Sequence, residues 1–329
     1  MFAVIANDVN CDLEKLAIVD VNIPQIKLPD QVLIKIRYAS INPVDYKLLA
    51  NHPQIWSYPY IPCLDFVGEV VEVGSHCNLV RKGDLVAAHA NLTYGGALAE
   101  YIVQPEHVLF KIPAGVDLKL AAAMPCAGLT AYQALVRKMN VQAGKTIFIQ
   151  AGSGGVGSFA IIIAKQLGLT VISSCSSRNY DYVKSLDADY IIDYTSCNVF
   201  DRIKKLFPSG IDYILETTNK DNLQLDWKIL SFNGQLASIV GIINTQEIPA
   251  FTTGFGFHEV ALGGAYLSNH YPSQCDLAQM GRDLLSLLVK ANKSPQITEY
   301  KFTDFKQAFM DLKTNKNPGK IVINFDEVK

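Results

Sequence analysis

Three glycines near the middle of the chain have the spacing of a turn that holds a phosphate group. Gly152, Gly154 and Gly157 fit the pattern G-x-G-x-x-G. In such a turn the first glycine permits a tight bend, the second lets the backbone approach a pyrophosphate, and the third packs a helix closely against a strand. The free N–H groups and the dipole at the start of that helix favour a negative charge. Taken alone, the pattern is equally compatible with an ordinary strand–turn–helix.

The segments around the glycines supply the context that the motif needs. Residues 146–150 have the pattern of a short buried strand, and residues 156–167 have the apolar spacing of a helix that ends at Gly168. Alternating strands and helices specify a parallel, doubly wound sheet, so we predict an α/β Rossmann domain that binds a dinucleotide. Its remaining elements are expected at residues 170–174, 180–186, 190–193, 213–215 and 234–241.

The segment after the second expected strand indicates which dinucleotide is bound. NAD-binding versions of the fold place an Asp or Glu about 20 residues past the glycines, where it binds the ribose hydroxyls. Residues 173–179 have no carboxylate there and instead carry Ser176, further serines and Arg178. Hydroxyls and a guanidinium bind a 2′-phosphate, which a carboxylate would repel. We therefore predict NADPH as the cofactor; the alternative is that Arg178 only caps a loop.

Length, composition and charge narrow the class of protein. The 329 residues favour two domains, and 49% hydrophobic against 18% charged residues allow large buried cores. The net charge is −2, no Lys/Arg run resembles a nucleic-acid footprint, and no apolar run is long enough to span a bilayer. Residues 1–9 lack the basic start of a signal peptide, and seven scattered cysteines form no C-x-x-C pair. We expect a cytoplasmic protein with a small-molecule substrate, and neither a membrane nor a nucleic acid as partner.

The ends of the chain have the composition of a second, β-rich domain. Short expected strands near the N-terminus are broken by Pro and Gly turns, without crossover helices. Near the C-terminus a helical pattern is followed by a strand at residues 319–325, which we expect to return to the N-terminal domain. The predicted division is a discontinuous β-rich domain and a central cofactor domain, over residues 1–121 with 266–329 and residues 122–265 respectively.

Several motifs, in order along the chain, resemble those of the medium-chain dehydrogenase/reductase superfamily, and in particular its zinc-free quinone oxidoreductase branch. They lie at residues 40–47, 62–70, 95–101, 127–132, 151–157 and 318–323. The resemblance implies a GroES-like fold for the β-rich domain. It also implies that the segment at residues 262–268 is the edge strand through which cofactor domains pair into a homodimer.

The positions that hold catalytic zinc in other members of this superfamily do not carry a zinc ligand set here. By resemblance those positions are Asn42, Leu64 and Cys126, of which only the last supplies a thiol. A catalytic zinc needs three protein ligands and an open position. His89 and His107 lie near the expected cleft in the sequence, but neither has ligand spacing with a partner, so we interpret both as satisfied or exposed histidines. We therefore predict no metal.

Without a metal to polarise an oxygen, conjugated acceptors are the easier substrates, because quinones and α,β-unsaturated carbonyls spread the charge of an incoming hydride. The resemblance places Asn42 beside the nicotinamide, with Asp45 and Tyr46 on the same segment. Tyr46 would donate a hydrogen bond or proton, and Asp45 would orient it. Asn-Pro-x-Asp is also common turn chemistry. Two further stretches are candidates for the pocket: Tyr58 and Tyr60, with a packed loop as the alternative, and residues 251–257 as an apolar lid, with a surface connection near a dimer interface as the alternative.

The resemblance also outlines the rest of the cofactor site. It implies a threonine facing the nicotinamide, backbone around the pyrophosphate, a tyrosine near the adenosine phosphate, a strand end at the sheet edge, and a lysine reaching the ribose or phosphate. These are Thr130; Ser153, Gly155 and Val156; Tyr194; Val240 and Gly241; and Lys320.

The resulting prediction is an NADPH-dependent, zinc-independent reductase of a quinone or α,β-unsaturated carbonyl. Two alternatives remain open. An enoyl-thioester reductase shares the fold, the cofactor and the lack of zinc, and would prefer enoyl-CoA to free enals. A sensor or structural protein would bind NADPH tightly with little turnover.

Overall fold

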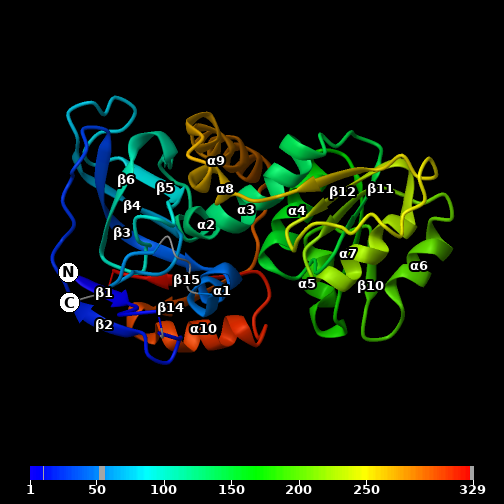
Figure 1. Cartoon of the computed structure of the whole chain (residues 1–329), viewed down its shortest axis with the longest axis horizontal. Coiled ribbons are helices and arrows are strands. Elements are labelled where there is room, and N and C mark those ends of the chain that lie inside the picture. The colour runs from blue at the N-terminus through cyan, green and yellow to red at the C-terminus, as the bar shows by residue number, and fades with distance from the viewer. Residues whose placement is uncertain (10, 52–55, 327–329) are drawn as a thin grey trace. The chain divides into compact units, whose positions relative to one another are not determined.

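The chain folds into two compact units. The structure, a computed structural model, describes residues 1–9, 11–51 and 56–326 and is shown in Figure 1. Unit 1 comprises Met1–Leu129, Leu262–Leu285 and Gln296–Lys329, and unit 2 comprises Thr130–Ala261 and Ser286–Pro295. Residues 327–329, the end of the expected C-terminal segment, lie outside the described part of the chain.

Unit 1 is built on a sheet in the order β14-β15-β3-β4-β5-β7, with β6 also paired to β3. All neighbours are antiparallel except β14 and β15. The strands are β3 (Gln31–Ile41), β4 (Asp65–Val73), β5 (Leu85–His89), β6 (Tyr101–Pro105), β7 (Phe110–Lys111), β14 (Ile297–Lys301) and β15 (Lys320–Asn324). A second sheet pairs β1 (Phe2–Ile5) with β2 (Ala17–Asp20). This antiparallel arrangement matches the predicted GroES-like domain.

The last strand of the chain returns to the first long one. β15 pairs with β3, with Ile321 opposite Ile41, which confirms the expected return of the C-terminal strand. Both strands are buried along most of their length, as strands in the middle of a sheet are. The helices that begin in or belong to unit 1 are α1 (Pro43–Asn51), α2 (Leu118–Ala123), α3 (Pro125–Tyr132), α8 (Gly264–Leu267), α9 (Tyr271–Ala291) and α10 (Phe305–Lys313); α3 and α9 continue into unit 2.

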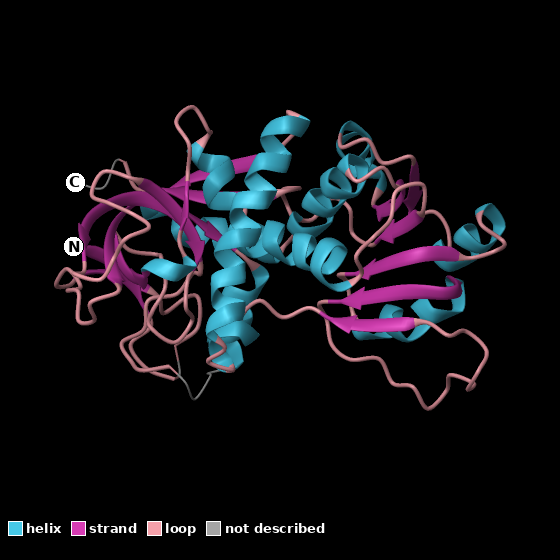
Figure 2. Cartoon of the chain, turned by 90° about the horizontal axis from the view of Figure 1, so that it is seen from above, coloured by secondary structure: helices cyan, strands magenta, loops and turns pink. Residues whose placement is uncertain are grey.

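Unit 2 is the predicted doubly wound sheet. Six parallel strands lie in the order β10-β9-β8-β11-β12-β13, which is the 3-2-1-4-5-6 order of a Rossmann fold. Figure 2 draws these strands as magenta arrows. The elements are β8 (Thr146–Ile149), α4 (Gly155–Gln166), β9 (Thr170–Cys175), α5 (Tyr180–Ser185), β10 (Tyr190–Asp193), α6 (Val199–Leu206), β11 (Ile211–Glu216), α7 (Lys220–Asp226), β12 (Leu230–Ser238) and β13 (Gly256–Glu259).

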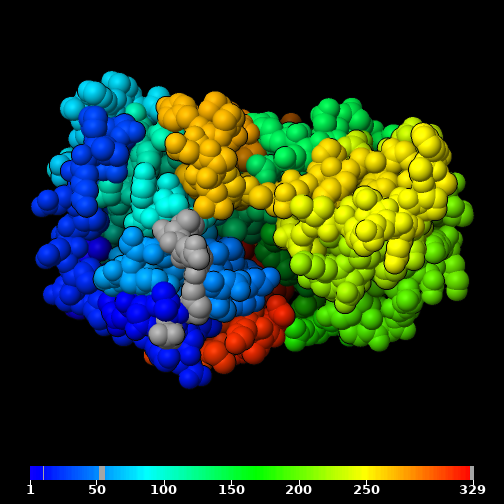
Figure 3. All heavy atoms as spheres, viewed as in Figure 1, coloured from blue at the N-terminus to red at the C-terminus, as the bar shows by residue number. Residues whose placement is uncertain are grey.

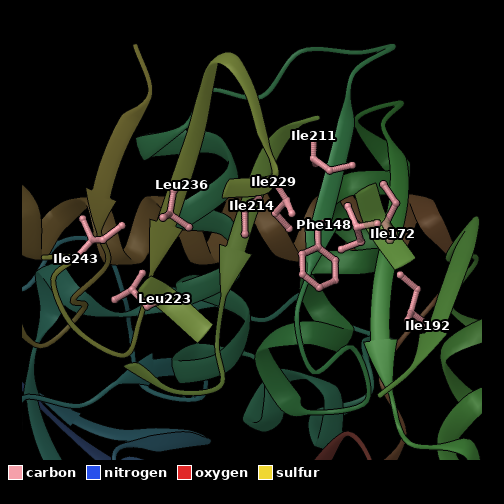
Figure 4. Close-up of a cluster of buried hydrophobic side chains, with 10 residues drawn as sticks. Phe148, Ile172, Ile192, Ile211, Ile214, Leu223, Ile229, Leu236 and Ile243 are labelled. Carbon is pink, nitrogen blue, oxygen red and sulfur yellow. The ribbon is translucent and has the colours of Figure 1, made fainter. Parts of the chain in front are cut away.

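A cluster of buried aliphatic side chains and one phenylalanine holds the sheet of unit 2 to its helices. Phe148 of β8 and Ile214 of β11 occupy adjacent strands, and Leu223 comes from α7 (Figure 4). All three are fully buried. This core fixes the carboxyl ends of the strands, which is where a doubly wound sheet binds its ligand.

One expectation about the end of unit 2 was wrong. Residues 262–268 contain the short helix α8 within unit 1, so they are not an edge strand; the parallel sheet ends at β13 on one side and at β10 on the other. Within residues 251–257, Phe255 and Phe257 pack against the core of unit 2 while Phe251 is fully exposed, which favours the surface connection over the lid. The segment before β13 is the yellow surface region of Figure 3.

In the described part of the chain, no helix has both the length and the apolar character needed to cross a bilayer.

Candidate functional site

In unit 1 the register of the sheet brings four strand ends together. Lys320 is the first residue of β15, Asp65 the first of β4 and His89 the last of β5, and Asn42 directly follows β3. Asp65 lies opposite His89 on neighbouring antiparallel strands, so their side chains share one face of the sheet. Residues far apart in the sequence thereby form one polar group at this edge.

Asn42, Asp45, Asp65 and Lys320, here called the buried charge cluster, are each at most 4% exposed. The Asn42 amide nitrogen donates to Asp65 Oδ2 at 2.8 Å and to the Ser40 carbonyl at 3.3 Å. The Lys320 ammonium donates to Asn42 Oδ1 and to the Ile41 carbonyl. The amide of Asn42 is therefore fully engaged inside unit 1.

Asp45 bonds to the backbone of the turn before α1, which is the structural alternative that the sequence offered to a catalytic role. Its Oδ2 accepts the backbone N–H of Asn42 at 2.6 Å, while the Asp45 N–H donates to the Asn42 carbonyl at 3.0 Å. The Asp45 carboxyl thus reaches back to the N–H of the residue before α1, as the acidic residue of a capping box does, and Pro43 occupies the first helical position. The expectation that Asp45 orients Tyr46 is not met, because the other oxygen of Asp45 has no hydrogen-bond partner among the described residues.

Burial changes the protonation of this cluster. Burial raises the pKa of Asp45 to about 8, so that this carboxyl is largely protonated at neutral pH. Burial also raises the pKa of Asp65, to about 6, against the opposing effect of Lys320 and the hydrogen bond from Asn42. Lys320 Nζ is 3.8 Å from Asp65 Oδ2. The negative charge of Asp65 and the positive charge of Lys320 thus offset each other.

The environment of His89 differs from the one expected from the sequence. It is 4% exposed and its Nδ1 has no hydrogen-bond partner among the described residues, so it is neither exposed nor satisfied. Burial lowers its pKa to about 4, which leaves the imidazole neutral. Possible ligand atoms of His89, Asp65 and Cys126 lie within 4.8 Å of one another. His107, in contrast, is satisfied by Gln274 at 2.9 Å.

Of the three candidate tyrosines, one has its hydroxyl hydrogen-bonded and two do not, among the described residues. Tyr60 is buried, stacks on Trp56 with ring centroids 3.7 Å apart, and donates to the Leu92 carbonyl, so it is a packing residue. Tyr46 on α1 is half-buried, and within the described ranges its hydroxyl has no hydrogen-bond partner. Tyr58 is half-buried beside Trp56. Among the described residues neither Tyr46 nor Tyr58 has a partner for its hydroxyl, and Tyr46 is the one that lies on α1, beside Asn42 and Asp45.

In unit 2 each of the three glycines of the motif is required, or tolerated, for a different structural reason. A Cβ on Gly157 would collide with the Ala151 carbonyl oxygen, and one on Gly152 with Ser173 Oγ of β9. Gly152 therefore serves close packing, whereas we expected it to serve a bend; the positive φ of the turn, 48°, belongs to Ala151. A Cβ on Gly154 would meet only the Ala151 oxygen, at 3.4 Å. The space above Gly154 is thus left open by the protein.

The turn ends in an uncapped helix. α4 begins at Gly155, and its N-cap residue Gly154 has no side chain to accept a hydrogen bond. The Ser158 hydroxyl donates backward to the Gly154 carbonyl at 2.7 Å, which holds the turn closed. Ser153 Oγ accepts a hydrogen bond from Asn179 Nδ2, and Ser153, Gly155 and Val156 are half-buried. An anion at this helix start would meet N–H groups and the positive end of the dipole, so the turn fits a pyrophosphate.

The other predicted cofactor residues of unit 2 lie mostly at the carboxyl ends of its strands. Ser176 follows β9, and Arg178 lies exposed in a short 3₁₀ turn (Ser177–Asn179). The N–H of Tyr194, after β10, donates to the Cys175 carbonyl, so Tyr194 stands next to that segment. Val240 and Gly241 follow β12, and Thr130 is 8% exposed in α3.

A buried acid pair at the point where the strand order reverses was not predicted. Glu216 ends β11 and Gln150 follows β8, and the Gln150 amide donates to Glu216 and, at 2.8 Å, to Asp226. Burial raises the pKa of Asp226 well above its usual range, and proximity to Glu216 raises it further; burial likewise raises the pKa of Glu216. The type and order of these residues give no motif; the register of β8 and β11 brings Gln150 beside Glu216, and the end of α7 adds Asp226.

Known proteins match the chain in both units. The profile of the alcohol dehydrogenase GroES-like domain matches residues 28–114, and that of the zinc-binding dehydrogenase matches residues 155–282. The trans-enoyl reductase pgmF of Aspergillus terreus (strain NIH 2624 / FGSC A1156) is 33% identical over 318 residues, covering 91% of this chain and 87% of that protein. The quinone oxidoreductase of Homo sapiens is 33% identical over 232 residues, covering 70% and 69% of the two chains. Mycobacterial Rv1454c, solved in complex with NADPH, has the same fold, with a TM-score of 0.86 at 22% identity over 99% of this chain and 100% of that one.

Proposed function

Because the chain belongs to the medium-chain dehydrogenase/reductase superfamily, in its quinone oxidoreductase-like branch, we propose that it transfers a hydride from NADPH to a quinone or an α,β-unsaturated carbonyl without zinc. In this reaction NADPH supplies the hydride and a proton completes the reduced acceptor, which leaves NADP⁺. The observation that carries the proposal is the uncapped, open glycine turn of unit 2 together with the absence of a carboxylate at the end of β9.

The protein binds NADPH through unit 2. The turn around Gly154 holds the pyrophosphate with backbone N–H groups at the start of α4. Ser176, Arg178 and Tyr194 follow the ends of β9 and β10, and these residues would hold the 2′-phosphate. A phosphate there gains charge-assisted hydrogen bonds that NADH cannot make.

In unit 1 the residues have separate tasks. Tyr46, whose hydroxyl has no partner among the described residues, donates a hydrogen bond to the acceptor oxygen. Asn42 and Asp45 are positioning residues, because their polar groups are used in the cap of α1 and in the contact with Asp65. Lys320 belongs with them, since its ammonium bonds to Asn42 and Ile41 within unit 1. This differs from the ribose or phosphate contact that the sequence suggested.

Reduction of an enoyl thioester is the second candidate function. It is favoured by the likeness to pgmF, which is named a trans-enoyl reductase and matches nearly the whole chain. The reaction is the same hydride transfer to a conjugated carbonyl, so the two functions differ in the size of the acceptor and not in the chemistry of the site.

We also propose a homodimer that forms through the free edge of β13, because β13 is the last strand of the parallel sheet and its outer edge pairs with no other described strand. Sedimentation of the purified protein tests this, with a dimer mass expected; a monomer mass at micromolar concentration contradicts it.

The direct test of the function is NADPH oxidation with four acceptors: a quinone, an enal, an enoyl-CoA and a simple ketone. We expect turnover of the quinone or the enal, little with the ketone, and a preference for NADPH over NADH. Strong preference for the enoyl-CoA would establish the second candidate function. Tight NADPH binding without turnover of any acceptor would refute both and indicate a sensor or structural protein. Tyr46→Phe is expected to lower kcat more than it raises KM, with Tyr58→Phe as the matched control.

A further inference from the structure

Three side chains of the types that bind zinc converge in unit 1, and only Cys126 is shared with the three positions that the superfamily resemblance points to. Asp65 and His89 face each other across β4 and β5, and Cys126 is the second residue of α3, with its N–H donating to Asp65 Oδ1 at 2.9 Å. Their ligand atoms lie within 4.8 Å of one another, and His89 Nδ1 has no hydrogen-bond partner in the described part of the chain. A carboxylate, an imidazole and a thiolate are the ligand types of catalytic zinc sites.

The same place already contains a cation. Lys320 is 4% exposed, and its ammonium is 3.8 Å from Asp65 Oδ2. The start of β15 fixes the backbone of Lys320, because its neighbour Ile321 lies opposite Ile41 in β3. Hydrogen bonds to Asn42 Oδ1 and to the Ile41 carbonyl satisfy the ammonium. A buried ammonium with these partners cannot turn to solvent without leaving Asp65 uncompensated.

We propose that Lys320 is the resident cation of this group and excludes a divalent metal from a latent Asp65–His89–Cys126 site. A divalent ion bound to Asp65 would lie near a fixed positive charge, and the repulsion between them is strong where water is excluded. The metal would also compete with Asn42 and Lys320 for the Asp65 carboxylate. Removing the lysine charge leaves Asp65 without a counter-charge, which a divalent ion among Asp65, His89 and Cys126 would then supply. Metal binding would then release the Cys126 thiol proton to solvent, because only the thiolate coordinates.

This inference deepens the zinc-free part of the proposed function, and its test measures metal binding instead of turnover. Failure here would therefore leave the acceptor assay unaffected, and the reverse also holds. The variants are Lys320→Met, which removes the charge at similar length, and Lys320→Arg, which keeps it. Lys320→Gln retains a donor toward Asn42 and serves as the second neutral variant if the methionine protein does not fold.

The experiment is a titration of each full-length protein with Co²⁺, followed by the thiolate-to-cobalt absorption band, and analysis of bound Zn²⁺ after dialysis. We expect Lys320→Met or Lys320→Gln to bind one metal ion per chain at least about tenfold more tightly than the wild type, with the thiolate band. That band should be lost in the double variant that adds Cys126→Ser, and the wild type and Lys320→Arg should lack it. A stoichiometric cobalt–thiolate band in the wild type would overturn the proposal. Equal metal affinity of the neutral variants and the wild type would overturn it as well.

Discussion

The two units offset buried negative charge in different ways. In unit 1 the Asp65 carboxylate is offset by the ammonium of Lys320, which is held in place by a strand. In unit 2 the buried carboxyls of Glu216 and Asp226 share the amide of Gln150, and no Lys or Arg of the described chain pairs with either. A proton must therefore offset one of these two charges. Unit 1 thus offsets its buried carboxylate with a permanent positive charge, whereas unit 2 offsets one of its two carboxylates with a proton.

The largest expected difference between the units is the stability that each loses when one buried carboxyl is replaced by an amide. Asp65→Asn leaves the Lys320 ammonium buried without its counter-charge, and we expect it to lower the free energy of unfolding by about 3 kcal/mol or more. Burial and Glu216 raise the pKa of Asp226, so an amide there replaces the protonated form that these surroundings favour, and we expect Asp226→Asn to lose less than about 1 kcal/mol. Urea unfolding at neutral pH measures both. Equal losses in the two variants would mean that the units do not differ in this way.

A second comparison separates packing from binding within the glycine turn. In Gly157→Ala the new methyl group meets the Ala151 carbonyl oxygen, which is backbone and cannot move cheaply. We expect a loss of about 1–3 kcal/mol of unfolding free energy. Gly154→Ala has room in the protein, so its stability should change by less than about 0.5 kcal/mol. Its NADPH Kd, measured by fluorescence titration, should rise at least about tenfold, because the methyl group stands where the pyrophosphate approaches.

A Gly154→Ala protein with unchanged NADPH affinity would show that the pyrophosphate does not lie over this glycine. A Gly157→Ala protein as stable as the wild type would show that the turn can relax around the methyl group.

Arg178 is expected to recognise the 2′-phosphate of NADPH. Arg178→Ala should raise the Kd for NADPH about 10- to 100-fold, as expected for the loss of a hydrogen bond to a charged group. The Kd for NADH should stay nearly constant, since NADH has no phosphate at that position. Lys184→Ala, which removes an exposed cation from α5, is the matched control. Equal losses for the two cofactors would assign Arg178 to the fold and not to phosphate recognition.

The smallest expected effect is a change of stability with pH in unit 1, and Asp45 causes it. The pKa of Asp45 is raised from 3.8 to about 8, mainly by burial. Since the folded protein holds this proton more tightly than the unfolded chain, the contribution of Asp45 to stability is complete below the usual carboxyl pKa and is lost as the pH rises through about 8. Asp45→Asn cannot titrate. Its stability relative to the wild type should therefore improve between about pH 5 and about pH 9.

Urea unfolding at several pH values checks this, and a stability difference that is constant with pH would contradict it. Asp226→Asn should change in the same direction, because burial raises the pKa of Asp226 as well.

Much of unit 2 could be predicted because its site is built mostly from local sequence. The turn, the helix after it and the strand order follow from glycine spacing and from alternating apolar segments, which act within about 30 residues. The edge of that sheet could not be predicted in the same way. Residues 262–268 have a pattern compatible with a strand, but Tyr266 is buried in unit 1 with its hydroxyl donating to the His89 carbonyl. That contact joins residues far apart in the sequence.

The site in unit 1 was predicted only as a set of residues. Asn42, Asp45 and Lys320 were expected to be functional, but the contacts of Asn42 with Asp65 and Lys320 depend on the register among β3, β4 and β15. Asp65 and His89 were missed or misjudged for the same reason, since nothing in the local sequence places them opposite each other. The one available signal was the polar residue at the end of each of these strands, where neighbouring strand ends meet.

Zinc-independent hydride transfer is tested most directly by the rate of NADPH oxidation with a quinone, measured on one protein preparation before and after dialysis against a chelator, with metal content determined in parallel. We expect the same turnover in both samples and less than stoichiometric metal in each. Loss of turnover on chelation, with recovery on adding Zn²⁺, would contradict it.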